Sequence, residues 1–406
     1  MSKIKVKGVY KIFGNHPKKA LKLVKKGLSK NEIFEKTGMT LAVKDATFDV
    51  KEGEIFVIMG LSGSGKSTSA RLLNRLVEPT AGEILVDGKN VVEMDKKELL
   101  NLRRNTMSMV FQSFALMPHM SIIDNACFGL EFAGVPKEER TKKGMAALEL
   151  VGLAPYANSM PDELSGGMKQ RVGLARALAA EPEILIMDEA FSALDPLIRC
   201  EMQDELLSLQ DKQKKTIVFI SHDLDEAIKL GDRIAIMEDG RIVQVGTSEE
   251  ILKNPADDYV KAFFKGVDPT QILSAGDILR KDTQVTIVKK HNGPGPRAVL
   301  QRLINYDREY GYIVDKEKRF LAVICTDTLR QSIKDSDTDI NLEDIYLEVE
   351  PIFINQPMLE IIDKIIKHSF PVPVVDEEMK FKGVISKNNF LRSLYHNKIE
   401  EAKENV

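Results

Sequence analysis

Residues 60–67 have the residue types and the spacing of a phosphate-binding loop, Gly60-Leu61-Ser62-Gly63-Ser64-Gly65-Lys66-Ser67. The stretch follows a strand-like apolar run at 55–59 and precedes a helix-like run at 68–76, which is the context that such a loop requires. Its glycines let the backbone curl until N–H groups face phosphate oxygens, and the following helix adds the positive end of its dipole. Lys66 would reach the β and γ phosphates, and Ser67 would offer its hydroxyl to Mg²⁺. A plain Gly/Ser turn needs neither this Lys-Ser pair nor three glycines.

Two carboxylates and one histidine follow later strand-like runs. Asp188 and Glu189 come directly after the apolar run at 184–187, and His222 comes after a run at 216–221. Apolar runs of this kind are typical of buried strands in a parallel sheet. We expect Asp188 to bind Mg²⁺, Glu189 to polarise an attacking water and His222 to contact the γ-phosphate. Without the loop upstream, the carboxylates could simply cap a helix and the histidine could be structural.

A second glycine-containing motif opens a predicted helix, Leu164-Ser165-Gly166-Gly167-Met168-Lys169-Gln170-Arg171. Backbone N–H groups at a helix N-terminus attract anions. Because Ser165-Gly166-Gly167 contains no lysine, it must act on phosphates that are held elsewhere.

Together these motifs resemble the ATP-binding cassette family, in its ATPase subunits, over residues 4 to about 250. The resemblance implies ATP and Mg²⁺ as cofactors and a head-to-tail dimer, in which Ser165 and Gly167 of one subunit cover ATP held by Lys66 of the other. It also implies that residues 114–119 receive a coupling helix from a membrane subunit. By matching positions it assigns catalysis to Glu189, His222 and Gln112, Mg²⁺ binding to Ser67, Gln112 and Asp188, and nucleotide contacts to Phe13 (stacking on the base), Gly60, Ser62, Gly63, Ser64, Gly65, Lys66, Ser67, Thr68, Ser165, Gly166, Gly167 and Asp195.

Three segments narrow the resemblance to ATPase subunits of glycine-betaine/proline importers, namely the insertion between Phe13 and Leu41, residues 59–68 and residues 188–195. The C-terminal part resembles a tandem pair of CBS domains, on Phe370-Pro371-Val372-Pro373-Val374-Val375-Asp376 and Gly383-Val384-Ile385-Ser386. CBS pairs often bind adenine nucleotides, and in Gram-positive osmolyte importers they resemble receptors for cyclic di-AMP. Thr328 and Asn389 stand where that family carries a ribose-binding Asp, which argues against simple binding of AMP or ATP. We expect the ligand contacts near 354–357 and 384–389.

An internal repeat supports two copies of one unit in the C-terminal part. Each of five residues has a counterpart 61 positions later, so that Asp315, Phe320, Val323, Ile324 and Leu329 match Asp376, Phe381, Val384, Ile385 and Phe390. Each copy is predicted to contain a helix, at 297–305 and 358–367. The expected fold class is α/β, a P-loop ABC-type nucleotide-binding domain with a helical subdomain, followed by an α+β tandem CBS pair. The expected domains are the ATPase at 1–266, a linker at 267–281, the CBS domains at 282–335 and 340–398, and a tail at 399–406.

The composition limits the class of protein. A chain of 406 residues, 43% of them hydrophobic, exceeds one core and predicts two or three globular domains. The formal net charge of −3 gives no whole-chain reason for nucleic-acid binding. The three cysteines are widely spaced without a CxxC pair, which favours a reducing compartment and argues against a zinc site. With no signal peptide and no run of about 18 apolar residues, we expect that the chain does not cross a membrane itself. The resemblance to importer ATPases implies a place on the cytoplasmic face of the cell membrane, attached through a permease subunit with a substrate-binding domain.

The N-terminal segment carries two further expectations. Residues 4–13 alternate and predict an exposed edge strand. Residues 16–30 hold six lysines and no acid, with Leu21, Val24 and Leu28 at helical spacing. This basic amphipathic segment could attract anionic lipid and respond to ionic strength, or it could be a solvated helix face. Residues 29–32 have the spacing of a capping box for a second short helix.

We interpret the chain as the ATP-hydrolysing subunit of an importer that drives osmoprotectant uptake through a separate membrane subunit, with regulation through the CBS pair and ionic strength. A soluble cassette protein of DNA repair or translation is one alternative, although this sequence has a single cassette and no sustained heptads. A small-molecule kinase would lack the motif at 165–167. A nucleotide sensor with an inactive cassette is the third alternative, and an ATPase assay separates it from the others.

Overall fold

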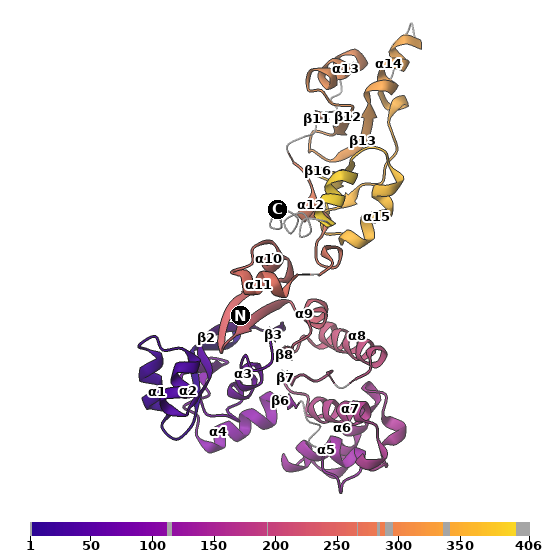
Figure 1. Ribbon diagram of the computed structural model, residues 1–406. Coiled ribbons are helices and arrows are strands. Elements are labelled where there is room, and N and C mark those ends of the chain that lie inside the picture. The colour runs from indigo at the N-terminus through magenta and orange to yellow at the C-terminus, as the bar shows by residue number, and fades with distance from the viewer. Residues whose placement is uncertain are drawn as a thin grey trace. The chain divides into compact units, whose positions relative to one another are not determined.

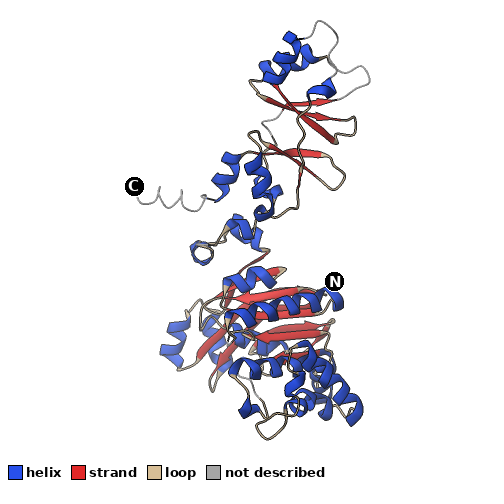
Figure 2. Cartoon of the chain, turned by 90° about the vertical axis from the view of Figure 1, so that its right-hand side faces the viewer, coloured by secondary structure: helices blue, strands red, loops and turns tan. Residues whose placement is uncertain are grey.

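The computed structural model describes residues 2–111, 116–192, 194–265, 267–281, 285–288, 295–335 and 342–394. The chain divides into two compact units, unit 1 at residues 1–264 and unit 2 at residues 265–406. Unit 1 contains two sheets with helices around them, and unit 2 contains two smaller sheets, each with helices of its own (Figure 1 and Figure 2).

The larger sheet of unit 1 has six strands in the order β10-β9-β3-β8-β7-β6. In chain order they are β3 (Ile55–Met59), β6 (Met107–Val110), β7 (Ile184–Asp188), β8 (Thr216–Ser221), β9 (Arg233–Glu238) and β10 (Arg241–Gly246). β10 runs antiparallel to β9, and the other neighbours are parallel. Every residue of β3, β7 and β8 is buried, which explains their almost continuous apolar runs and confirms the buried parallel strand predicted at 184–187.

The strand order brings three distant segments to one edge of this sheet. β8 lies between β3 and β7, and the pairing is in register at the carboxyl ends, with Met59 opposite Ser221 and Asp188 opposite Ile220. The residues that follow these strands are the loop at 60–67, Glu189 and His222. Because parallel strands end on the same side, the predicted catalytic groups must meet there.

The smaller sheet of unit 1 is antiparallel and has the order β2-β1-β4-β5. Its strands are β1 (Ser2–Phe13), β2 (Thr40–Lys51), β4 (Ala81–Val86) and β5 (Lys89–Asn90). β1 pairs with β2 on one side and with β4 on the other, so the prediction of an exposed edge strand at 4–13 is wrong. The alternation at 4–13 reports a strand with one face in the core, and this pattern does not distinguish an edge strand from a central one.

Two short helices, α1 (Pro17–Val24) and α2 (Lys30–Thr37), form the insertion between β1 and β2. Ala20, Val24 and Ile33 of the helices are buried in one cluster with Ile12 and Leu41 of the strands. The predicted capping box is confirmed, since the side chains of the N-cap serine and of the glutamate three residues later both bond the opposite backbone N–H. The lysines of α1 and of the turn after it all face solvent: Lys18, Lys19, Lys22, Lys25 and Lys26.

The remaining helices of unit 1 surround the sheets (Figure 1). They are α3 (Lys66–Leu73), α4 (Lys96–Asn101), the π-helical turn η1 (Leu102–Thr106), α5 (Ile122–Phe132), α6 (Lys137–Leu150), η2 (Ala154–Tyr156), η3 (Pro161–Glu163), α7 (Gly166–Ala179), α8 (Pro196–Gln213), α9 (Leu224–Leu230), α10 (Ser248–Lys253) and α11 (Asp258–Phe263). α5, α6 and α7 pack on one another and confirm the helical region predicted at about 120–180. α3 is shorter than the predicted run at 68–76, because Arg75 has a positive φ of 52° that ends the helix.

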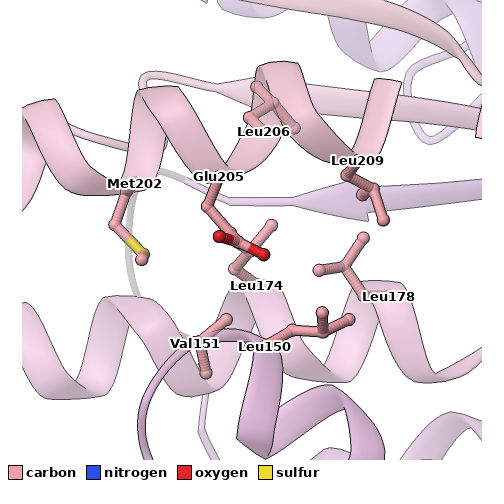
Figure 3. A pocket seen from close by; sticks show the side chains of 8 residues that line it. All are labelled: Leu150, Val151, Leu174, Leu178, Met202, Glu205, Leu206 and Leu209. Carbon is pink, nitrogen blue, oxygen red and sulfur yellow. The ribbon is translucent and has the colours of Figure 1, made fainter. Parts of the chain in front are cut away.

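A small apolar cavity lies between α7, α8 and the end of α6 (Figure 3). Its volume of about 20 Å³ holds little more than one water molecule. Its lining is aliphatic apart from Glu205, with Leu150, Val151, Leu174, Leu178, Met202, Leu206 and Leu209. The cavity is therefore a packing gap between helices and offers no room for a substrate.

Unit 2 repeats one arrangement of strands. Parallel β11 and β12 with antiparallel β13 form one sheet, and parallel β14 and β15 with antiparallel β16 form the other. The elements are η4 (Pro269–Gln271), α12 (Ala275–Ile278), β11 (Val285–Val288), α13 (Pro296–Asn305), β12 (Tyr310–Val314), β13 (Phe320–Cys325), α14 (Thr326–Asp335), η5 (Leu342–Ile345), β14 (Ile352–Phe353), α15 (Met358–Lys367), β15 (Val372–Val375) and β16 (Phe381–Ile385). α13 and α15 confirm the two predicted helices.

The two copies meet through reciprocal contacts. The Phe320 N–H donates to the Met379 carbonyl at 2.8 Å, and the Phe381 N–H donates to the Lys318 carbonyl at 2.9 Å. Since 320 and 381, and likewise 318 and 379, are matched positions of the repeat, the two bonds are related by a pseudo-two-fold axis. Around them both phenylalanine rings pack with Tyr312 in a shared apolar cluster.

The segment predicted as a linker is folded into unit 2. Ala275 and Ile278 of α12 are buried in the core of the second copy, and the Gly276 N–H donates to the Ile354 carbonyl at 2.8 Å. Residues 267–281 thus cover a strand of that copy, which their Gly and Pro content did not indicate. Parts of the predicted C-terminal division, residues 282–284, 289–294, 340–341 and 395–406, lie outside the described residues.

Candidate active site

The phosphate-binding loop follows β3 and wraps around the start of α3. Gly65 has a φ of 103°, and a Cβ added there would overlap the carbonyl oxygen of Ala42 on β2. A Cβ at Gly60 would overlap the carbonyl oxygen of Met237 on β9. Glycine is required at these two positions because both sheets of unit 1 press against the loop.

The Lys66 ammonium is held inside this loop. Its side chain is only 5% exposed, and its Nζ donates to the carbonyl oxygens of Gly60 at 2.8 Å and Leu61 at 3.1 Å. Burial lowers the pKa of Lys66, while the carboxylates of Glu189 and Asp188 oppose that shift. A buried cation that is balanced only by carbonyls and nearby carboxylates is a suitable partner for phosphate oxygens.

A cavity of about 270 Å³ opens beside the loop. Seven predicted site residues line it, namely Ser62, Gly63, Gly65, Lys66, Ser67, Thr68 and Glu189. Four further residues line it that the sequence analysis did not single out, Lys30, Thr40, Leu41 and Ala42. Gly60 and Ser64 belong to the loop but not to this lining, and within the described part of the chain the buried Ser64 hydroxyl has no hydrogen-bond partner.

Asp188 ends β7 as a fully buried carboxylate, at 0% exposure. Its Oδ2 accepts a hydrogen bond from Arg71 of α3 at 3.3 Å, whereas its Oδ1 has no partner among the residues that the structure describes. An unpartnered buried carboxylate oxygen is costly unless a cation or water completes it. With the Ser67 hydroxyl it offers the oxygen ligands that Mg²⁺ prefers, so these two residues fit the ion. Gln112, the third predicted Mg²⁺ ligand and a predicted catalytic residue, lies outside the described residues, as do residues 113–115.

Glu189 and His222 face each other across the ends of β7 and β8. Glu189 has a positive φ of 49°, unusual for a residue with a side chain, and its N–H donates to the Ile220 carbonyl at 3.1 Å. Its Oε2 lies 3.6 Å from Nδ1 of His222. Strain of this kind is tolerated where the surrounding structure fixes a functional side chain, and here it turns Glu189 toward the cavity.

The motif at 165–167 is separate from the loop. Ser165 caps α7 and accepts a hydrogen bond from the Met168 N–H at 3.3 Å, and Ser165 and Gly166 are exposed. None of the three residues lines the cavity. Asp195 is likewise exposed at the start of α8, where it accepts from the Ile198 N–H at 3.1 Å.

Phe13 also lies beside the cavity lining and not in it. It is exposed at the end of β1, opposite Thr40, with the Lys11 ammonium 4.7 Å from its ring centroid. Of the predicted nucleotide contacts, the loop residues therefore converge with Glu189 within one chain, whereas Ser165, Gly166, Gly167, Asp195 and Phe13 do not line the cavity.

Unit 1 and part of unit 2 match families of known proteins. A family model described as ABC transporter matches residues 43–192, and one described as CBS domain matches residues 346–396. A solved dimeric ATP-binding cassette in a post-hydrolysis state, bound to ADP and Pi, matches with a TM-score of 0.53 at 32% identity, over 60% of this chain and 98% of its own. The fold of unit 1 is thus that of an ATP-binding cassette, a class that forms dimers.

Relatives cover nearly the whole chain. It is 55% identical over 393 residues to the glycine betaine/proline betaine transport system ATP-binding protein ProV of Escherichia coli (strain K12), with 97% of both chains covered. It is 50% identical to the glycine betaine transport ATP-binding protein OpuAA of Bacillus subtilis (strain 168), over 97% of this chain and 93% of the relative. It is 47% identical to the glycine betaine/carnitine transport ATP-binding protein GbuA of Listeria monocytogenes serotype 1/2a (strain 10403S), over 98% and 99%.

The chain belongs to the family of ABC transporter ATP-binding subunits that includes these three proteins. It is an ATPase subunit coupled to transport. The predicted family and fold class are confirmed. Among the described residues, no helix has the length and apolar character needed to cross a bilayer.

Proposed function

We propose that this chain hydrolyses ATP to drive uptake of a quaternary amine of the glycine betaine or proline betaine type through a separate permease. The names of the relatives support the substrate class. The proposed ATP hydrolysis rests on one observation. Buried Lys66, buried Asp188 and strained Glu189 converge at one edge of the sheet. The chain would then lie at the cytoplasmic face of the membrane, attached through the permease.

Each residue at the edge has a proposed role. Lys66 exchanges its loop carbonyls for β and γ phosphate oxygens, and Ser62–Thr68 supply N–H and hydroxyl donors around them. Mg²⁺, when bound, neutralises phosphate charge, and Ser67, Asp188 and Gln112 would hold it. Glu189 accepts hydrogen bonds from the attacking water and orients it. His222, 3.6 Å from Glu189, contacts the γ-phosphate and stabilises the charge that develops there.

The residues at 165–167 and Asp195 are proposed to act on ATP that a second copy of the chain holds. Ser165 to Gly167 are accessible at a helix N-terminus. They contain no cationic side chain, so they could not hold a triphosphate alone. In a head-to-tail dimer they cover ATP that is held by the partner's loop, and Asp195 lies at the same interface.

Phe13 stacks on the base, since its strand neighbour Thr40 already lines the cavity.

The uptake assay tests the substrate and the coupling together. The chain is copurified with its permease, reconstituted into vesicles loaded with ATP, and assayed for uptake of labelled glycine betaine, with the Lys66→Ala complex as the control. Uptake of glycine betaine that requires Lys66 supports the proposal. ATP hydrolysis without uptake of any quaternary amine would overturn the substrate class.

Unit 2 is proposed to regulate transport by binding cyclic di-AMP, over the CBS domains assigned to 282–335 and 340–398. A symmetric pair of repeats, doubled in the cassette dimer, suits a symmetric ligand. Unit 2 contains a cavity of about 930 Å³, lined by Leu321, Ala322, Glu343, Tyr346, Leu347, Glu348, Val349, Glu350, Asp363, Lys364, Lys367 and His368. None of the contacts expected at 354–357 and 384–389 lines this cavity, and residues 354–356 instead bond to the segment around α12. Deleting residues 267–406 should abolish inhibition of uptake by cyclic di-AMP, and inhibition that persists would contradict the proposal.

The exposed lysines of α1 and of the turn after it are proposed to sense ionic strength. Attraction of Lys18, Lys19, Lys22, Lys25 and Lys26 to anionic lipid weakens as salt shortens the Debye length, which is about 10 Å at 0.1 M. Replacing all five by glutamine should flatten the salt activation of uptake in anionic vesicles. An unchanged activation curve would place the sensor elsewhere.

A further inference from the structure

The insertion between β1 and β2 brings a second lysine to the phosphate-binding loop. Lys30 is the first residue of α2, directly after the Ser29 cap. The capping box fixes this turn, and buried Ile33 anchors the helix in the cluster around Leu41. The backbone from which the Lys30 side chain extends is therefore held firmly against the cassette (Figure 1).

The Lys30 side chain, 32% exposed, reaches the cavity that holds Lys66. Its Nζ lies 3.3 Å from the carbonyl oxygen of Gly63, at the tip of the loop. Lys66 instead bonds the carbonyls of Gly60 and Leu61 at the base of the loop. One loop thus carries two ammonium groups, one from α3 and one from the insertion.

The present partners of Lys30 are weak. The Asp239 carboxylate, in the turn between β9 and β10, is 3.8 Å from Nζ and is largely exposed, so this pair contributes little. The contact with Gly63 is long for an N–H···O hydrogen bond. An ammonium has three donors, and a phosphate oxygen is a stronger acceptor than either present partner.

We propose that Lys30 is a phosphate-contacting residue of the nucleotide site, supplied by the insertion, and that Asp239 competes with the nucleotide for it. The inference rests on the proposed ATP site and adds a residue that lies outside its motifs. It also makes the position of α2 sensitive to nucleotide, because the phosphate and the helix then share one side chain. The rival explanation is a structural strut, in which Lys30 only ties α2 to the loop and to the β9–β10 turn.

The two explanations predict different effects of Asp239→Asn on nucleotide affinity. If Lys30 is a strut, Asp239→Asn removes one end of it and weakens nucleotide binding or changes nothing. If Asp239 competes, the same change frees the ammonium and tightens binding. Asn tolerates the positive φ of 45° at this position, so the turn is preserved.

The test measures ADP binding to the full-length chain by titration calorimetry in EDTA, where no hydrolysis occurs. We expect Lys30→Gln to weaken ADP binding about tenfold, as for loss of one charge-assisted hydrogen bond, and Lys30→Arg to stay within about twofold of the parent. Asp239→Asn should tighten binding about twofold to threefold. The double variant should match Lys30→Gln, because Asp239 acts only through Lys30. Lys36→Gln, an exposed lysine at the other end of α2, is the matched control and should leave affinity unchanged.

The outcomes separate this inference from the proposed function. Equal ADP affinity of the parent and Lys66→Ala would show that the nucleotide does not bind at this loop, which overturns the proposed site itself. A large loss at Lys66→Ala together with parental affinity at Lys30→Gln would overturn only the role of Lys30. A loss at Lys30→Gln with parental or weakened affinity at Asp239→Asn would also overturn it, in favour of the strut.

Discussion

The two units of this chain use their charged side chains differently. At the sheet edge of unit 1, Lys66 and Asp188 are buried, and no described residue bonds Oδ1 of Asp188. In unit 2 each of the two matched turns holds an ion pair that is at least partly exposed, Asp315 with Arg319 at 2.8 Å and Asp376 with Lys382 at 2.8 Å. Buried, incompletely paired charge costs stability and persists where a ligand completes it, whereas exposed pairs contribute little either way.

The contact between the two copies of unit 2 is mainly apolar and aromatic, unlike the charged sheet edge of unit 1. The copies of unit 2 meet through aromatic rings and two reciprocal backbone hydrogen bonds, and the Tyr312 hydroxyl donates to the Pro371 carbonyl. The comparison therefore assigns chemistry to unit 1 and ligand-dependent or structural roles to unit 2, and variants in each unit should change different observables.

The largest effect is expected at Glu189. Glu189→Gln keeps the shape of the side chain but loses the ability to accept a proton from water, so hydrolysis should fall about 10² to 10⁴-fold while ATP binding is retained. Turnover by the reconstituted complex and equilibrium ATP binding are the two measurements. Turnover within twofold of the parent would contradict the assigned role.

Ser165→Asp tests whether the site is shared between copies. The carboxylate would face the γ-phosphate across the dimer interface, so turnover should fall about 100-fold while single subunits still bind ATP. Formation of dimers with ATP is measured by analytical ultracentrifugation in the Glu189→Gln background. Equal dimer formation with and without the Ser165 change would refute the composite site.

Much of this site was predictable because it depends on local patterns. The loop at 60–67 and the capping box at 29–32 contain all the residues that define them, and the apolar runs of β3, β7 and β8 identify buried strands without knowledge of their partners. The site residues themselves stay predictions until variants are assayed, and Gln112 lies outside the described residues.

What the sequence did not indicate depends on pairing between distant segments. The edge position expected for β1 was wrong because its second partner, β4, is separated from it by the whole of β2 and β3. The packing of α12 on the second copy of unit 2 and the approach of Lys30 to Gly63 depend in the same way on tertiary contacts. The residue pattern of one segment does not show which distant segment packs against it.

Lys66→Ala is expected to have a smaller effect than the catalytic variants, and on a different quantity. Removal of the ammonium should weaken ATP affinity about 10 to 100-fold, because one buried charge-assisted contact to the phosphates is lost. Affinity measured by fluorescence titration would stay at the parental value if the phosphates bind elsewhere. Lys36→Gln, at an exposed lysine that does not line the cavity, serves as the control.

The smallest effect is expected at Tyr312 in unit 2, and it concerns stability alone. Tyr312 is 2% exposed, burial raises its pKa so that the hydroxyl stays protonated, and the hydroxyl donates to the Pro371 carbonyl at 2.7 Å. Tyr312→Phe leaves that carbonyl without its donor and should lower the free energy of unfolding of unit 2 by about 1 to 3 kcal/mol. Calorimetry of the full chain should show a lower transition temperature for unit 2, with ATP turnover unchanged. The exposed Tyr306→Phe is the matched control, and equal transitions in both variants would mean that the bond between the copies adds nothing to their association.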